Sequence, residues 1–207
     1  MIIEWGILLP AIVLLFYPAD RILPQNLRLR TYGQLSDPAR THRHRWWLWQ
    51  PALWADAFRC GASIWLVRFA LTSGHGNGGP PPAVLLGGLL LIGVLPQMVT
   101  LRKPATMFAP LGYVFAALFV LLPFAAALPA AVLGAVGLMA LREFSAIFIG
   151  GAIVTGVFGY LLGGNVTTVA ILAGVFALPA VVSTMFRCKL VLPVHSRSET
   201  IPVPAAR

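Results

Sequence analysis

The stretch that decides the fold runs from Ala83 to Phe186, opening with AVLLGGLLLIGVLPQMVTL (83–101) and closing with VTTVAILAGVFALPAVVSTMF (166–186). It contains 104 residues and only four charged side chains. A soluble domain has no use for so much apolar sequence, whereas lipid is a solvent that suits it. The stretch therefore predicts an all-α fold, a polytopic integral membrane helix bundle. The four charges come as two adjacent pairs, Arg102-Lys103 and Arg142-Glu143.

The composition of the whole chain agrees with this class. Of 207 residues, 58% are hydrophobic and 10% are charged, against about 25% charged residues in an average soluble domain. A net charge of +9 would also suit a nucleic-acid partner. Basic residues gather in the cytoplasmic loops of membrane proteins, however. We therefore expect the lipid bilayer, and not nucleic acid, as the main partner.

Apolar runs and polar breaks divide the chain into four segments. Residues 1–17 form a first transmembrane span, and residues 18–50 form a basic cytoplasmic loop. Residues 51–186 form a membrane bundle of about six further spans. Residues 187–207 form a basic tail whose prolines and charges predict flexibility. The spans expected in the bundle cover 51–71, 83–101, 106–122, a segment that ends at 141, 144–162 and 166–186.

The distribution of basic residues orients these seven spans. With the amino terminus outside and the carboxyl terminus cytoplasmic, the cytoplasmic segments hold thirteen of the fifteen Lys and Arg residues. The outer segments hold none, and the other two, Arg59 and Arg68, lie within the second span. This separation follows the positive-inside rule. We expect a multi-pass protein of the plasma (inner) membrane of a bacterium.

The fifth span leaves an alternative open. Only twelve residues separate Pro129 from Arg142, which make ~18 Å of helix against a hydrocarbon core of ~30 Å. The span either begins near Phe124 and carries Pro129 or is a half-helix. The competing interpretation is one helix from Ala130 to Leu162, which would give six spans and place Arg142 within the membrane. The charge distribution argues against this six-span topology.

Two pairs of charged residues are the candidate polar sites. Asp56 and Arg59 lie three residues apart in the second span, so they share a helix face and can form an ion pair. Arg142 and Glu143 are the candidate pair of the six-span topology. Ionisable groups inside a membrane span face protein or water and indicate function by default. For Asp56 and Arg59, an ion pair at head-group depth that only fixes the helix is an equally good interpretation.

The basic loop is a candidate platform for anionic lipid head groups or an acidic partner, because each Arg near a membrane surface contributes ~1 kcal/mol of attraction. The alternative is that its arginines only set the topology. His42 and His44 supply two ligands at most, too few for a tetrahedral metal site, and we expect no metal, cofactor or catalytic residue. The candidate lipid or partner contacts are Arg28, Arg30, Arg40, Arg43 and Arg45.

These features favour a non-catalytic membrane scaffold or accessory subunit. The first alternative is a small transporter or channel that uses one of the two charged pairs. The second is a membrane enzyme that acts at the cytoplasmic surface, but the carboxylates show no pairing typical of catalysis. Gly151, Thr155, Gly159 and Gly163 repeat at a four-residue spacing that lets helices approach closely. We expect this row to pack within one bundle, and a homo-oligomer or a larger membrane complex is its alternative use.

Overall fold

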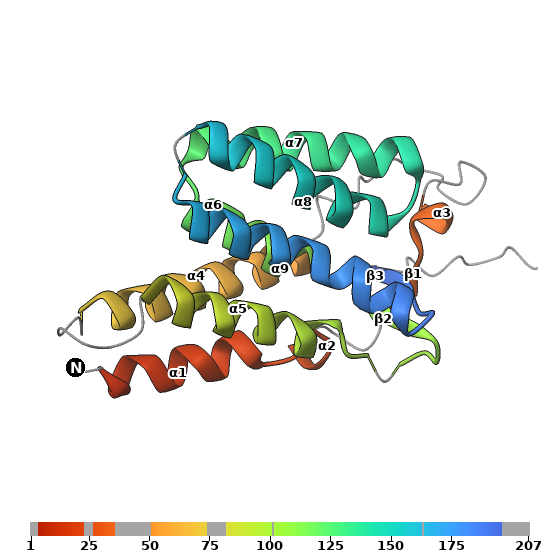
Figure 1. The fold of residues 1–207 in the computed structure, drawn as a ribbon. Helices are drawn as coiled ribbons and strands as arrows, with labels where there is room; N and C mark the ends of the chain where they lie inside the picture. The colour runs from red at the N-terminus through yellow and green to blue at the C-terminus, as the bar shows by residue number, and fades with distance from the viewer. Residues whose placement is uncertain are drawn as a thin grey trace, which may run out of the picture.

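The computed structural model describes residues 4–22, 27–35, 51–73, 82–100, 102–162 and 164–195 (Figure 1). These residues are mainly helical, so the predicted all-α class is confirmed. Seven of the helices described have eleven residues or more: α1 (Trp5–Phe16), α4 (Pro51–Ser73), α5 (Pro82–Met98), α6 (Leu111–Leu121), α7 (Phe124–Leu141), α8 (Phe144–Leu161) and α9 (Val166–Met185). The shorter elements are α2 (Ala19–Ile22), α3 (Tyr32–Leu35), β1 (Leu27–Arg30), β2 (Thr106–Phe108) and β3 (Lys189–His195).

The seven longer helices alternate in direction along the chain. The ends of α4 and α6 lie beside the starts of α5 and α9, because residues from all four line one cavity. A smaller cavity joins the start of α4, the end of α5 and the start of α6. Short turns then make α7, α8 and α9 into antiparallel hairpins (Figure 1). Alternation places every second connection at the same end of the bundle.

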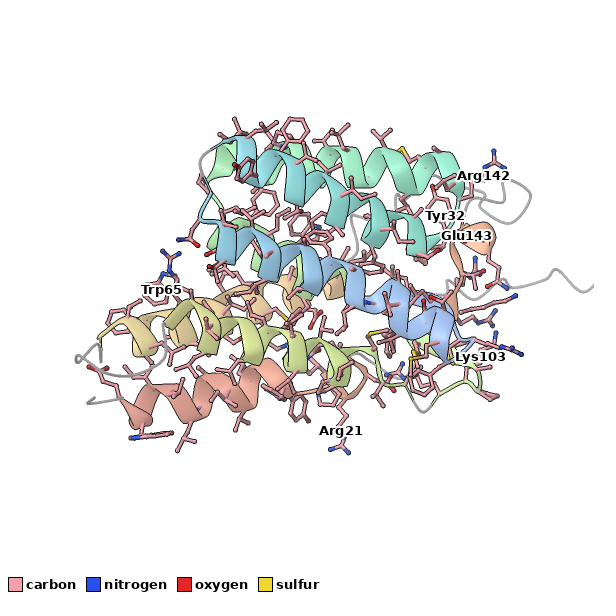
Figure 2. All side chains as sticks on the ribbon, in the orientation of Figure 1. Arg21, Tyr32, Trp65, Lys103, Arg142 and Glu143 are labelled. Atoms are coloured by element: carbon pink, nitrogen blue, oxygen red, sulfur yellow. The ribbon has the colours of Figure 1, made fainter. Side chains whose placement is uncertain are left out.

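We call the end where α1, α5, α7 and α9 finish the basic end, and the other the opposite end. Sequence position places eight described Lys and Arg residues in the connections at the basic end. Figure 2 shows two of them, Lys103 and Arg142, projecting at this end of the molecule. The eight residues are Arg21, Arg28, Arg30, Arg102, Lys103, Arg142, Arg187 and Lys189.

Three helices, α7, α8 and α9, are long and apolar enough to cross a membrane. Their 18 to 20 residues correspond to ~27–30 Å, close to the thickness of the hydrocarbon core. Large apolar side chains project outward along the whole of α7, and such a surface suits lipid and not water. This agrees with the membrane class that the sequence predicts. The exposed residues of α7 include Phe124, Leu128, Val132, Val136 and Met139.

Helix α6 lies inside the bundle. It has eleven residues, of which seven are buried, and its ~16 Å is too short to cross a membrane alone. The prediction of a span from 106 to 122 is therefore wrong at its start, because Thr106–Phe108 form β2. The apolar composition of this segment reflects contact with other helices. Irregular backbone at membrane depth is tolerated where protein surrounds it.

A break at Arg142 separates α7 from α8. The backbone of Arg142 has φ 54°, in the left-handed region. Its N–H donates a hydrogen bond to the carbonyl oxygen of Leu138 in the last turn of α7. Helix α7 begins at Phe124 and carries Pro129 inside it, which confirms one of the two forms predicted for the fifth span. The competing single helix from Ala130 to Leu162 is wrong, because two antiparallel helices occupy that range.

Strand β3 is the central strand of a three-stranded sheet of order β1-β3-β2. It pairs antiparallel with β1 and parallel with β2. The prediction of a flexible tail from residue 187 is wrong for Lys189–His195, because Leu190, Val191 and Leu192 are buried there. Pairing with β2 ends at Val191, so Pro193 lies where only β1 flanks the strand. A proline without an N–H is tolerated at such a place.

The small residues of α8 pack against α9. A Cβ built on Gly151 would lie 2.5 Å from the ring of Phe176, and one on Gly159 would lie 2.9 Å from Val169. Thr155, between them, is 1% exposed. This side of the row therefore serves close packing within the bundle, the first of the two uses expected for it.

Candidate functional site

The candidate site is built around the end of α1. This helix stops at Phe16, and Pro18 follows Tyr17, so the chain cannot continue as a helix. The last carbonyl groups of any α-helix lack partners within the helix. In a membrane protein such groups need donors from elsewhere, because lipid supplies none. The donors here come from α4 and α5.

Arg59 of α4 supplies the first set of donors. Its Nη1 donates to the carbonyl oxygens of Leu14 and Tyr17, the latter at 3.0 Å. Its Nε and Nη2 donate to Asp56 Oδ1 at 3.2 and 2.7 Å. Nη2 also donates to Gln97 Oε1 at 2.9 Å. A guanidinium has five N–H donors, and these five contacts use all of them.

Gln97 of α5 supplies the second set. Its Nε2 donates to the carbonyl oxygens of Leu15, at 2.7 Å, and Tyr17, at 2.9 Å. The side chain is only 1% exposed, and the side-chain oxygen receives the hydrogen bond from Arg59. Both polar ends of this amide are therefore satisfied, as a buried polar group requires. The cluster joins α1, α4 and α5 at one point.

Asp56 neutralises the cation of this cluster. The Asp56 and Arg59 side chains are 13% and 10% exposed, so leaving either charge without the other would be costly. A Cβ built on Gly112 would lie 2.8 Å from Asp56 Oδ2, so α6 approaches the carboxylate as closely as a glycine allows. Asp56 and Gln97 also line a cavity of about 30 Å³ beneath the sheet, enough for roughly two water molecules.

In this geometry the Asp56–Arg59 pair connects the end of α1 to α4 and α5. A positive charge at a helix C-terminus is favourable because it complements the helix dipole. With all five donors in use, the guanidinium has none left for a substrate, and a cavity of about 30 Å³ holds little besides water. Of the two interpretations that the sequence allows for this pair, the contacts agree with the one in which it fixes the helices.

A second ion pair lies nearby in the chain connections. Arg102 Nε contacts Asp20 Oδ1, and Arg102 Nη2 donates to the Asp20 carbonyl oxygen at 2.7 Å. The Thr100 hydroxyl donates to Asp20 Oδ2 at 3.3 Å. These contacts attach α2 to the segment after α5. No sequence pattern relates these two charges, because 82 positions separate them.

The Arg142–Glu143 pair lies at the exposed turn between α7 and α8 (Figure 2). Glu143 Oε2 accepts a hydrogen bond from the Ser145 hydroxyl at 3.1 Å. Both charged residues face outward at the basic end, not into the bundle. The role of an intramembrane polar group, which required one continuous helix here, therefore has no geometric support.

The candidate lipid or partner contacts divide into two groups. Arg28 is exposed and Arg30 half-buried, both on β1 at the basic end. Arg40, Arg43 and Arg45 lie outside the residues that the structure describes, as do His42 and His44. Among the described residues, no three His, Cys, Asp or Glu side chains come together as metal ligands.

The sequence does not predict the role of Gln97 or of the α1 carbonyl groups. One signal points to them: a helix that ends at Tyr17-Pro18 inside an apolar chain needs external donors. Comparison of the chain with protein-family models, curated proteins and solved structures gave no match.

Proposed function

We propose that this chain is a non-catalytic, multi-pass membrane protein, a scaffold or accessory subunit whose basic end faces the cytoplasm and binds anionic lipid head groups. The observation that carries the proposal is the collection of eight described Lys and Arg residues at one end of the bundle. Six of them are exposed, and they come from four separate connections of the chain. The six are Arg21, Arg28, Lys103, Arg142, Arg187 and Lys189.

Electrostatics favours lipid as the partner of this end. Each Lys or Arg near an anionic leaflet contributes ~1 kcal/mol of attraction, and few carboxylates oppose it here. Asp20 pairs with Arg102, which leaves Glu143 as the exposed carboxylate of the described part of the basic end. A membrane surface can contact several separated cations at once, since its charge is spread over the plane. An acidic protein partner is the second form of the same chemistry.

Seven crossings with the amino terminus outside are the topology that we propose for the bundle. The support is the alternating direction of the seven longer helices together with the positive-inside rule. Helix α4 has 23 residues, or ~35 Å, and is long enough to cross despite its three charges. The short α6 is enclosed by other helices. The plasma membrane of a bacterium is the location that this charge distribution suits.

A four-fold substitution tests the lipid-binding role. Changing Arg28, Lys103, Arg187 and Lys189 to Gln removes four exposed charges, while Arg21, Arg102 and Arg142 remain to orient the chain. We expect correct insertion and at least a several-fold loss of phosphatidylglycerol retained during purification at low salt. The difference should fade at high salt, because exposed charges are screened within ~10 Å at 0.1 M.

The matched control keeps the charges and changes the side chains. Arg28→Lys combined with Arg187→Lys should retain anionic lipid at the level of the unmodified protein. If the Gln variant inserts correctly and keeps the same lipid at every salt concentration, the basic end is not a lipid-binding surface. An inverted Gln variant would show that these charges serve topology alone.

A further inference from the structure

A second cavity lies at the opposite end of the bundle from the basic residues. Its volume is about 210 Å³, and it is bounded by the ends of α4 and α6 and the starts of α5 and α9. This exceeds the ~150 Å³ apolar cavity that accommodates benzene and falls below the ~300 Å³ of small drug sites. A short segment of hydrocarbon chain is the ligand that fits such a space.

The lining of this cavity is apolar with a polar group of three residues. The apolar side chains include two buried leucines, Leu90 at 0% and Leu71 at 5% exposed. The polar members are Arg68, Thr72 and Thr168. The Thr72 hydroxyl already donates to backbone carbonyls of its own helix. The remaining lining residues are Ala83, Leu86, Gly87, Leu121 and Ile171.

Arg68 differs from Arg59, the other arginine of the same helix, in its hydrogen bonding. Arg59 uses all five of its N–H donors within the protein. Among the described residues, Arg68 makes a single hydrogen bond, from Nη1 to the Val120 carbonyl oxygen at 2.9 Å. No ion pair to Arg68 occurs in that part of the chain. Within the described residues, four of its five donors have no protein partner and can bind an anion.

Arg68 lies at the end of the bundle where basic residues are otherwise rare. It is the one Lys or Arg in the described part of the opposite end, where the positive-inside rule disfavours basic residues. The stacked rings of Trp65 and Phe69, 5.8 Å apart, lie on either side of it in sequence. Figure 2 shows Trp65 toward the opposite end of the molecule, far from Lys103 and Arg142. Tryptophan marks the membrane–water interface, so Arg68 lies at the depth of lipid head groups.

We propose that this cavity binds one acyl chain that carries an anionic head, with the chain between α4, α5 and α9 and the head on the Arg68 guanidinium. Charge complementarity selects the head, because a carboxylate or phosphate accepts two hydrogen bonds from one guanidinium. Cavity volume selects a single chain. Thr168, half-buried at the start of α9, supplies a neighbouring hydroxyl. The site is independent of the lipid contacts at the basic end.

Photolabelling tests this site directly. The protein in phosphatidylcholine nanodiscs is incubated with dodecanoate that carries a diazirine in its chain, irradiated, and its labelled peptides are mapped by mass spectrometry. We expect saturable labelling within 68–72 and 83–90. Arg68→Gln should weaken saturable labelling by about tenfold, as expected for loss of a charge-assisted hydrogen bond. Arg68→Lys, which keeps the charge, should retain most of it.

A cavity-filling variant provides a second test that does not touch the charge. Ala83→Phe places a ring in the cavity and should abolish saturable labelling. The matched control is Val84→Phe, because Val84 is the next residue, is 50% exposed and does not line the cavity. Val84→Phe should label like the unmodified protein. Equal labelling of both variants would overturn the proposal.

Competition separates the sources of the ligand. Dodecanol has the same chain without the anion and should not displace the probe. Displacement by dodecanoate alone identifies a free fatty acid, whereas displacement also by phosphatidylglycerol identifies an anionic phospholipid. Either result supports the site. Equal displacement by dodecanol, unchanged labelling of Arg68→Gln, or labelling spread over the outer face of α7 would overturn it and leave Arg68 as an interfacial anchor.

Discussion

Replacing Arg59 by methionine should destabilise the protein more than replacing Arg68, the other arginine of α4. The substitution removes the donor to the Leu14 carbonyl oxygen, whereas the Tyr17 carbonyl oxygen keeps its bond from Gln97. A backbone carbonyl left without a donor in an apolar environment costs about 1–3 kcal/mol. The Asp56 carboxylate, 13% exposed, is also left uncompensated, and breaking a buried pair from one side costs about 3–5 kcal/mol. Partial hydration from the adjacent cavity lowers that second cost, so we expect about 4 kcal/mol in all.

The double mutant separates the two contributions. Asp56→Asn alone should cost about 2 kcal/mol, because the amide keeps an acceptor for Arg59 but loses the charge. Simple addition predicts about 6 kcal/mol for the pair of changes. We expect about 3 kcal/mol instead, because Arg59→Met removes the charge that Asp56 neutralises. The remaining cost is the lost cap of α1.

Reversible unfolding by SDS titration in mixed micelles measures these free energies. Arg68→Met is the matched control, because it removes an arginine of the same helix with one hydrogen bond, and it should cost about 1 kcal/mol or less. In Arg59→Met, the rate of hydrogen exchange should increase more for the amides of α1 than for those of α8. The reasoning is refuted if the two costs add to within about 0.5 kcal/mol, or if Arg59→Met costs no more than Arg68→Met.

Three further predictions concern packing, the sheet and topology. Gly151→Leu should destabilise the protein by about 1–3 kcal/mol in the same titration, because a Cβ there meets an aromatic ring at 2.5 Å. Gly150→Leu, where a Cβ would have nothing within 4 Å, should be nearly neutral. Equal costs of the two changes would contradict the α8–α9 packing. Ending the chain after Cys188 removes β3 and its buried apolar residues, so its thermal melting temperature should fall by several degrees, and an unchanged value would show that the sheet contributes no stability. A single cysteine at Gly76 should react with an impermeant reagent outside intact cells, and one at Lys103 should not; the reverse pattern would disprove the proposed orientation.

The class of the protein could be predicted from sequence because lipid imposes a constraint on every residue of a span. A run such as 166–186 has no charge to place in water, and its length matches the hydrocarbon core. The start of the helix at Phe124 was one of two predicted forms, and the structure selects it. Helix lengths were predicted less well. Burial inside a bundle and exposure to lipid both favour apolar residues, so α6 resembles a lipid-facing span in composition.

The connections between distant segments could not be predicted. The pairing of Asp56 with Arg59 follows from a three-residue spacing on a helix. The bonds from Gln97 to α1 span 80 to 82 residues, and no periodicity encodes a contact of that kind. Strand β3 was missed for a related reason. Its apolar part is Leu190, Val191 and Leu192 between a lysine and a proline, too short to be recognised without the partners that bury it.

The strand order β1-β3-β2 has a consequence for how the protein is made. The strands β1 and β2 flank β3 and form no ladder with each other. β3 follows all seven longer helices in the chain, so during synthesis both earlier strands wait without a partner until α9 has been completed. Their edges meanwhile lack the ladder hydrogen bonds that β3 later supplies. The sheet at the basic end therefore takes its final form only after the last helix has been made, and a chain that lacks β3 leaves β1 and β2 unconnected.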